Sequence, residues 1–119
     1  MTSHPLTVLI PTHGRATLLA RTLDSLAECD RPDAYRETVV VENGPPAGAR
    51  DLVARAAEAH PGLRLRYLHV ERANKSHALN EALATVEQGL VVFFDDDVRL
   101  SPGVLVAYAE AAAEYPEHG

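Results

Sequence analysis

The sequence predicts an α/β fold in which an open, mainly parallel sheet of about four strands carries helices on both faces. Three observations favour it: four short apolar runs rich in β-branched residues, four stretches with helical spacing of apolar residues, and strong turn residues at the junctions. Strands that alternate with helices form parallel sheets through right-handed crossovers. Because the chain contains no repeat, linker or low-complexity tract, we expect residues 1–119 to form a single domain.

The expected strands each end in turn or polar residues. They cover residues 7–10, 38–41, 64–70 and 90–94. The first is expected to stop at Pro11 and the second at the turn sequence that starts with Glu42. Residues 90–94 are apolar throughout, which predicts a strand that is buried on both faces.

Apolar residues recur at helical spacing in four segments and predict the core-facing sides of helices. These residues are Leu19, Leu23 and Leu26; Leu52, Val53, Ala56 and Ala57; Leu79, Ala82, Leu83 and Val86; and Val104, Leu105, Tyr108, Ala111, Ala112 and Tyr115. Ser101 before Pro102 predicts the start of the last helix, with serine as the cap and proline in the first turn.

Composition and charge disfavour several classes of function. The formal net charge of -6 and the pI near 5.4 argue against a nucleic-acid backbone or an anionic membrane as the main partner. A polyanionic ligand would need local help, such as a metal ion.

Cys29 is the only cysteine, which excludes an intrachain disulfide and a cysteine set for structural zinc. The chain shows no 18-residue apolar run and no charged secretory start, which predicts a cytoplasmic protein without an integral membrane segment.

Polar clusters follow all four expected strands. They are residues 11–15, 42–44, 71–76 and 95–97. The carboxyl ends of parallel strands meet at one edge of a sheet, and open α/β sheets bind ligands outside that edge. The four clusters are therefore expected to converge on a ligand site.

Asp95, Asp96 and Asp97 directly follow the last apolar run. Like charges ~4 Å apart repel by about 4 kcal/mol at an effective dielectric of roughly 20, and a bound cation, raised pKa values or exposure to water would offset this. In an extended chain Asp95 and Asp97 point to one side and Asp96 to the other, so the outer pair could face one ion. Hard oxygen ligands near phosphate suit Mg²⁺ or Mn²⁺ better than zinc. The alternative is a solvated acidic turn, or Asp97 acting near the start of the next helix.

Other residues at this edge have more than one interpretation. Glu42 could accept hydrogen bonds from a nucleoside, as acidic residues at strand ends do in other nucleotide folds, or be an exposed turn residue. Arg15 and Lys75 could neutralise a diphosphate, fix a carboxylate of the aspartate cluster, or remain solvated. His13 and His77 lack the spaced partners of a metal motif and are interpreted as loop and helix-surface residues. Neither G-x-G-x-x-G nor G-x-x-x-x-G-K-[ST] occurs, which disfavours dinucleotide enzymes and P-loop NTPases.

Four segments together resemble the family 2 glycosyltransferases of the GT-A fold. They are residues 8–15 (VLIPTHGR), 39–44 (VVVENG), 74–80 (NKSHALN) and 93–98 (FFDDDV), and the last is similar to the family's D-x-D signature. The resemblance extends over essentially the whole chain. It implies the Rossmann-like, nucleotide-sugar-binding half of a GT-A domain, with Mg²⁺ or Mn²⁺ as cofactor. It also implies a nucleotide-diphosphate sugar as donor, UDP-sugars above all.

The resemblance also assigns roles to residues. It implies that the donor is bound by Pro11, Thr12, Arg15, Glu42, Asn43, Lys75, Asp95 and Asp96, and that Asp97 and Asp95 are the metal ligands. Asp97 would be the main direct ligand, and Asp95 would lie near the ribose. This chain departs from the family at two positions, because it has Glu42 where the family more often has Asp and Gly14 where it more often has Asn.

For chemistry, the resemblance implies an inverting displacement at the anomeric carbon, with the metal stabilising charge on the departing diphosphate. The acceptor hydroxyl needs a general base, which in this family lies beyond the length of this chain, and no substitute is identified. We therefore expect the donor-binding portion of a glycosyltransferase without the acceptor-binding half, and the acceptor is unknown. A non-catalytic nucleotide-sugar-binding module or an inactive fragment is the alternative.

Two further expectations concern other classes of protein and other partners. A receiver-like phosphoacceptor domain is disfavoured, because its acidic pair follows the first strand, where this chain has Pro11, Thr12 and His13. An incomplete sheet would expose apolar surface, which favours self-association.

Overall fold

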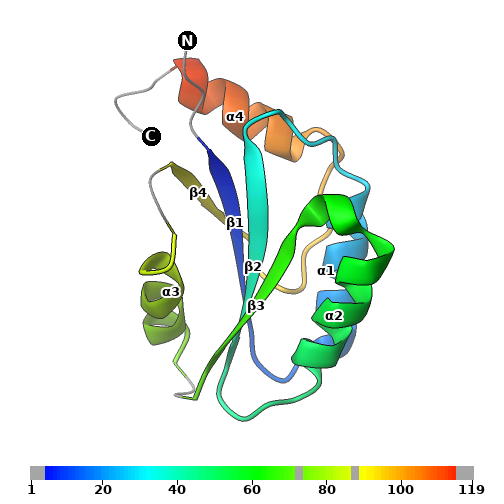
Figure 1. Cartoon of the computed structure of the whole chain (residues 1–119), viewed down its shortest axis with the longest axis vertical. Coiled ribbons are helices and arrows are strands. Elements are labelled where there is room, and N and C mark those ends of the chain that lie inside the picture. The colour runs from blue at the N-terminus through cyan, green and yellow to red at the C-terminus, as the bar shows by residue number, and fades with distance from the viewer. Residues whose placement is uncertain (1–4, 72–73, 87–88, 115–119) are drawn as a thin grey trace.

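The computed structural model describes residues 5–71, 74–86 and 89–114, which contain four strands and four α-helices (Figure 1). In chain order these are β1 (Leu6–Thr12), α1 (Ala16–Ala27), β2 (Tyr35–Asn43), α2 (Ala49–Ala59), β3 (Leu65–Val70), α3 (Lys75–Leu83), β4 (Leu90–Phe93) and α4 (Val104–Glu114). A short 3-10 helix, Pro61–Leu63, precedes β3. The predicted alternation of strands and helices is confirmed.

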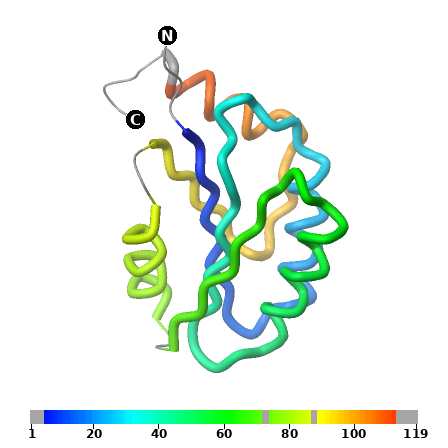
Figure 2. The backbone as a smooth tube through the Cα atoms, in the orientation of Figure 1, coloured from blue at the N-terminus to red at the C-terminus, as the bar shows by residue number. Residues whose placement is uncertain are grey.

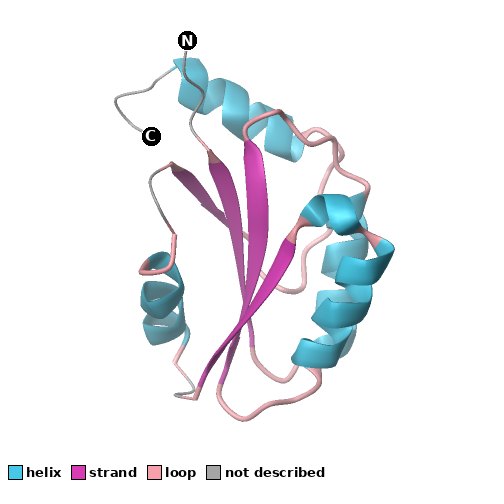
Figure 3. Ribbon diagram, in the orientation of Figure 1, coloured by secondary structure: helices cyan, strands magenta, loops and turns pink. Residues whose placement is uncertain are grey.

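The four strands are all parallel and lie in the order β3-β2-β1-β4 (Figure 3). The chain moves outward from β1 to β2 and β3, and then returns across the sheet to place β4 on the other side of β1; the tube in Figure 2 follows this path. A right-handed crossover in the return direction puts its helix on the opposite face. The strand order therefore reverses between β1 and β4, which is where open α/β sheets bind ligands.

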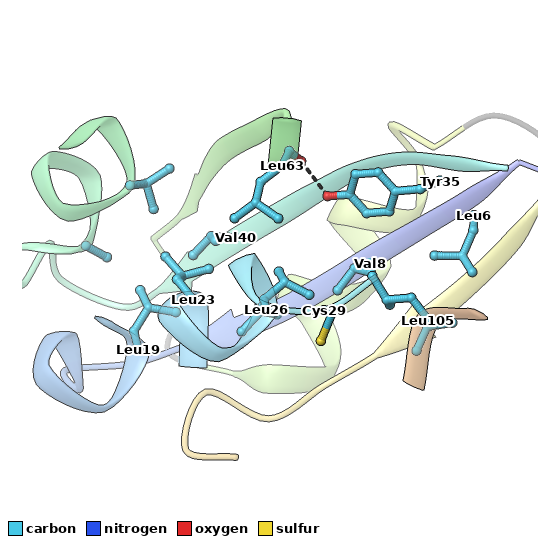
Figure 4. Packing of buried hydrophobic residues seen from close by; sticks show 14 residues of the cluster. Leu6, Val8, Leu19, Leu23, Leu26, Cys29, Tyr35, Val40, Leu63 and Leu105 are labelled. Atoms are coloured by element: carbon cyan, nitrogen blue, oxygen red, sulfur yellow. Dashed lines mark hydrogen bonds between the residues drawn. The ribbon is translucent and has the colours of Figure 1, made fainter. Parts of the chain in front are cut away.

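Two hydrophobic clusters cover the two faces of the sheet, which confirms the prediction of helices on both. The larger cluster packs Leu6, Val8, Ile10, Val40 and Val92 of the sheet against Leu19, Leu23 and Leu26 of α1, Val53 of α2 and Leu105 of α4 (Figure 4). The smaller cluster packs Leu9, Val39, Val41 and Val70 against Ala78 and Ala82 of α3. Each fully buried leucine stabilises the fold by about 1.5–3 kcal/mol, so the three-leucine stripe of α1 is a main contributor.

Tyr35, the first residue of β2, connects this strand to the 3-10 helix. Its side chain is buried, and its hydroxyl donates to the carbonyl oxygen of Leu63 and lies 2.6 Å from the hydroxyl of Thr38 (Figure 4). Burial raises the pKa of Tyr35 to about 12, so the phenol stays protonated and able to donate at neutral pH.

The first strand is longer than the sequence predicts, because Pro11 does not end it. Pro11 and Thr12 continue β1 and pair with β2. The backbone N–H of Phe94 donates to the carbonyl oxygen of Leu9, so Leu9 faces β4 and, by alternation along the strand, so does Pro11. Because β4 ends at Phe93, no residue of β4 lies opposite Pro11 to accept a backbone hydrogen bond. Proline, which has no backbone N–H, therefore costs the sheet no hydrogen bond at this position.

The prediction that the last strand is buried on both faces is wrong. Val92 is buried, whereas Phe93 is 48% exposed. Among the described strands β4 is paired only with β1 and forms an edge of the sheet, so one neighbour is not enough to cover its side chains. The exposed Phe93 side chain adds apolar surface at this edge, as expected for an incomplete sheet. Self-association through this surface stays a prediction.

Two helix boundaries also differ from the predicted ones. Val86 lies past the end of α3. The last helix begins at Val104, after a turn closed by a hydrogen bond from the Val104 N–H to the Ser101 carbonyl oxygen, so Ser101 and Pro102 precede the helix and do not start it. Tyr115 lies outside the described residues. Within the described ranges, no helix is both long and apolar enough to cross a membrane.

Candidate functional site

A cavity of about 420 Å³ lies at the carboxyl ends of β1 and β4, where the strand order reverses. It is lined by Pro11, Thr12, His13, Arg15, Asn43, Lys75, Asp95, Asp96 and Asp97. Residues from the carboxyl ends of β1 and β2, from the segments after β1 and β4, and from the first turn of α3 thus meet at one place, as expected for the polar clusters. Within the third cluster, residues 72–73 lie outside the described residues.

Asp96 is the buried member of the aspartate triplet, with a side chain that is 7% exposed. Its Oδ2 accepts a hydrogen bond from the Thr12 hydroxyl at 2.8 Å, and its Oδ1 lies 3.4 Å from Nη1 of Arg15. The hydroxyl of Thr22 in α1 donates to the Asp96 carbonyl oxygen at 2.9 Å. A buried carboxylate is tolerated only when it is paired and hydrogen-bonded, so these contacts tie the segment after β4 to β1 and α1.

Asp96 and Asp97 lie in a turn, and Nη1 of Arg15 lies 3.4 Å from a carboxylate oxygen of Asp96 and 3.5 Å from one of Asp97, so the alternation predicted for an extended chain does not hold through the triplet. Asp95 and Asp97 are its two exposed members. Their side chains are 61% and 45% exposed. Nζ of Lys75 lies 3.0 Å from Oδ1 of Asp95, and Nη1 of Arg15 lies 3.5 Å from Oδ2 of Asp97. Both pairs are open to solvent, where an ion pair contributes about 0–1 kcal/mol, so other charges can displace these cations at small cost.

A pair of reciprocal hydrogen bonds joins the ends of β1 and β2 at the rim of the cavity. Nδ2 of Asn43 donates to the Thr12 carbonyl oxygen at 3.1 Å, and Nδ1 of His13 lies 2.6 Å from the Asn43 carbonyl oxygen. Because a carbonyl oxygen only accepts, Nδ1 of His13 carries the proton. His13 is a loop residue, as the sequence predicts, and it also lines the cavity, a role that the sequence interpretation did not assign to it although its position directly after Thr12 was a signal for it.

Glu42 lies apart from this cavity. It is 1% exposed and lines a second cavity of about 250 Å³ with Tyr67 and His69. Its Oε2 accepts from the Ala47 N–H at 2.8 Å, and its Oε1 accepts from the Tyr67 hydroxyl at 2.5 Å. Burial, together with this bond to Glu42, raises the pKa of Tyr67 to about 12. Glu42 therefore links the loop between β2 and α2, through Ala47, to Tyr67 of β3, and the alternative of an exposed turn residue is wrong.

The described residues contain no group of three histidine, cysteine, aspartate or glutamate side chains placed to hold a metal ion. Asp95 and Asp97 are two hard oxygen donors at the mouth of the same cavity. Mg²⁺ and similar ions are commonly held by one or two carboxylates together with water and substrate phosphates. The residues at this edge thus fit a divalent cation that arrives with a phosphorylated ligand, and do not form a complete cage of their own.

A parallel sheet with a polar cavity at its switch point defines the class of the protein as a Rossmann-like α/β domain. The chain belongs to a glycosyltransferase family: the model of "Glycosyltransferase like family 2" matches residues 4–118. No curated protein matches the chain.

Several solved structures share the fold. A mannosyltransferase from Pyrobaculum calidifontis, solved in complex with GDP-Man and Mn²⁺, is 37% identical, with a TM-score of 0.78 over 94% of this chain and 32% of that one. TarS from S. aureus is 25% identical, with a TM-score of 0.78 over 92% of this chain and 20% of that one. Residues 1–349 of TarS with UDP-GlcNAc are 24% identical, with a TM-score of 0.80 over 94% and 32%, which shows the fold alone. The chain spans about a third or less of these proteins.

Gly14 gives a physical reason for one departure from the family pattern. Its φ is +63°, in the left-handed region. Glycine adopts this conformation without strain and asparagine tolerates it better than most residues, so either one suits the turn that leads from β1 to Arg15.

Proposed function

We propose that this chain binds the nucleotide-diphosphate sugar of a glycosyltransferase, through a Mg²⁺ or Mn²⁺ ion held by Asp97 and Asp95. The observation that carries the proposal is the composition of the cavity at the switch point. Two exposed carboxylates and two exposed cations, Arg15 and Lys75, lie together there. The mannosyltransferase with GDP-Man and Mn²⁺ supports the same choice of ligand and ion.

The charges of the cavity suit an exchange of partners on binding. In the structure Lys75 lies against Asp95, and Arg15 lies against Asp97. A diphosphate alone would meet both carboxylates and be repelled, whereas a divalent cation neutralises them. Arg15 and Lys75 would then be released toward the phosphate oxygens, which guanidinium and ammonium groups bind well.

The remaining cavity residues would hold the rest of the donor. Pro11, Thr12 and Asn43 form the wall on the side of β1 and β2. In this proposal they border the nucleoside. Glu42 would act on the nucleoside indirectly, by fixing the loop between β2 and α2 through its hydrogen bond to Ala47. The proposal does not choose between uracil and guanine as the nucleotide base. A cytoplasmic location stays a prediction.

Sugar transfer is proposed for the complete enzyme, as an inverting displacement in which the bound ion stabilises the charge of the leaving diphosphate. It requires an acceptor site and a general base, neither of which is assigned to a residue of this chain. A non-catalytic nucleotide-sugar-binding module would share the same cavity. Assaying release of sugar from GDP-Man and UDP-GlcNAc by the complete protein separates the two, because a module would bind a donor and release nothing.

Calorimetric titration of GDP and of UDP, in Mn²⁺ and in EDTA, tests the proposal. Because residues 5–71, 74–86 and 89–114 offer no complete metal cage, ion and nucleotide should each strengthen binding of the other by the same factor, about 5- to 150-fold. At least one of the two nucleotides should show this gain. Equal affinities in Mn²⁺ and in EDTA for both nucleotides would contradict the proposal.

A further inference from the structure

Side chains of α1 and of the residues just past its end bond the segment that follows β4. Thr22 and Ser25 of α1, and Cys29 two residues beyond the helix, hydrogen-bond to backbone groups of Asp96, Val98, Leu100 and Ser101. The Leu100 N–H donates to Oγ of Ser25 at 3.2 Å, and the Cys29 thiol donates to the Ser101 carbonyl oxygen at 3.3 Å. The segment that carries the exposed aspartates is thus fixed on α1, although it has no regular secondary structure of its own.

Thr22 makes the contacts nearest to the cavity. Its hydroxyl lies 2.9 Å from the Asp96 carbonyl oxygen and 3.0 Å from the Val98 carbonyl oxygen, and its side chain is fully buried. These two carbonyls flank Asp97 on either side. The shared hydroxyl proton therefore holds the backbone before and after Asp97, whose own side chain is half exposed at the cavity.

We infer that Thr22 is a positioning residue for Asp97, and that it sets how strongly the metal ion couples to the nucleotide without touching either one. The inference rests on the proposed function. Asp97 lines both the main cavity and a neighbouring cavity between α1 and residues 97–99. Its side chain is therefore not packed against protein on either of these two sides. Its contact with Arg15 at 3.5 Å is an exposed ion pair that holds it weakly, so its direction depends mainly on its backbone. Thr22 is the side chain that holds both flanking carbonyls. Groups that orient a metal ligand are typically worth 10- to 100-fold in metal affinity.

The experiment compares Thr22→Val, which keeps the shape and removes the hydroxyl, with Thr22→Ser, which keeps the hydroxyl. The measured quantity is the ratio of nucleotide affinity in Mn²⁺ to that in EDTA, by calorimetry. For Thr22→Val this ratio should fall about 10-fold or more, while the affinity in EDTA stays as in the unmodified chain. Thr22→Ser should keep the ratio within about threefold, because the positioning hydroxyl remains.

Ser25→Ala provides the matched control, since it removes a hydrogen bond to the same segment three residues beyond Asp97. It should lower the melting temperature and leave the ratio unchanged. A folded Thr22→Val protein with an unchanged ratio, or a ratio that falls equally in Ser25→Ala, overturns the inference. If Thr22→Val does not fold, Thr22→Cys replaces it, because a thiol is a weaker donor than a hydroxyl. An unchanged ratio of nucleotide affinity in Mn²⁺ to that in EDTA for Thr22→Cys overturns the inference equally. If the unmodified chain itself shows no gain with Mn²⁺, the proposed function fails, and this inference fails with it.

Discussion

Asp97→Asn is expected to remove most of the gain in nucleotide affinity that Mn²⁺ provides. The substitution keeps the size of the side chain and removes the negative charge that attracts the ion. A charge-assisted contact is worth about 1.5–3 kcal/mol, which corresponds to a loss of roughly 10- to 150-fold. Calorimetric titration of GDP and UDP with and without Mn²⁺ measures it. Affinity in EDTA should remain or rise, because one repulsive carboxylate has been removed.

Asp51→Asn is the control for this change of charge. Asp51 is an exposed aspartate in the first turn of α2 and lines the smaller cavity beside Glu42. The substitution alters the net charge by the same amount, so a general electrostatic effect would appear in both variants. If the metal-dependent gain survives in Asp97→Asn, or falls as much in Asp51→Asn, Asp97 is not the ligand that we propose.

Asp96→Ala is expected to cost about 2–4 kcal/mol of stability, for a reason unrelated to the ion. The change removes the acceptor of the buried Thr12 hydroxyl and one partner of Arg15, and it leaves a small void between β1 and α1. Against a total stability of about 5–15 kcal/mol for a domain, such a loss is large. Urea unfolding, followed by circular dichroism, measures it.

Asp96→Asn separates the hydrogen bond from the charge. The amide oxygen can still accept from Thr12, so we expect a loss of only about 1 kcal/mol. A cost for Asp96→Ala within about 0.5 kcal/mol of zero, as for an ordinary surface substitution, would show that Asp96 does not anchor the segment after β4.

The sequence predicted the features of the site that depend on connectivity. Strands that alternate with helices must bring their carboxyl ends to one edge, so Thr12, Asn43 and Asp96 meet in the structure although they are far apart in the chain. The strand that precedes the aspartate triplet was predicted from its apolar run. These predictions needed no knowledge of side-chain packing.

The parts that were wrong or missed depend on packing and pairing. Glu42 was expected to be a nucleoside contact or an exposed turn residue. It follows Val40 by two residues, shares its face of β2 and is buried, so the exposed alternative is wrong and the nucleoside contact stays a prediction. Phe93 was expected to be buried, but its burial depends on which strands neighbour β4. The extension of β1 through Pro11 depends on where its neighbour ends. Apolar patterns do not encode strand order or strand ends, so these features required the structure.

The central claim is that an ion and a diphosphate bind together at the carboxyl ends of β1 and β4. Paramagnetic broadening of backbone amide signals by Mn²⁺, in the presence and absence of GDP or UDP, tests it most directly. The account predicts broadening centred on Thr12, Asn43 and Asp97, and much stronger broadening when ion and nucleotide are both present. Broadening centred on the cavity beside Glu42 and Tyr67, or independent of nucleotide, would contradict it.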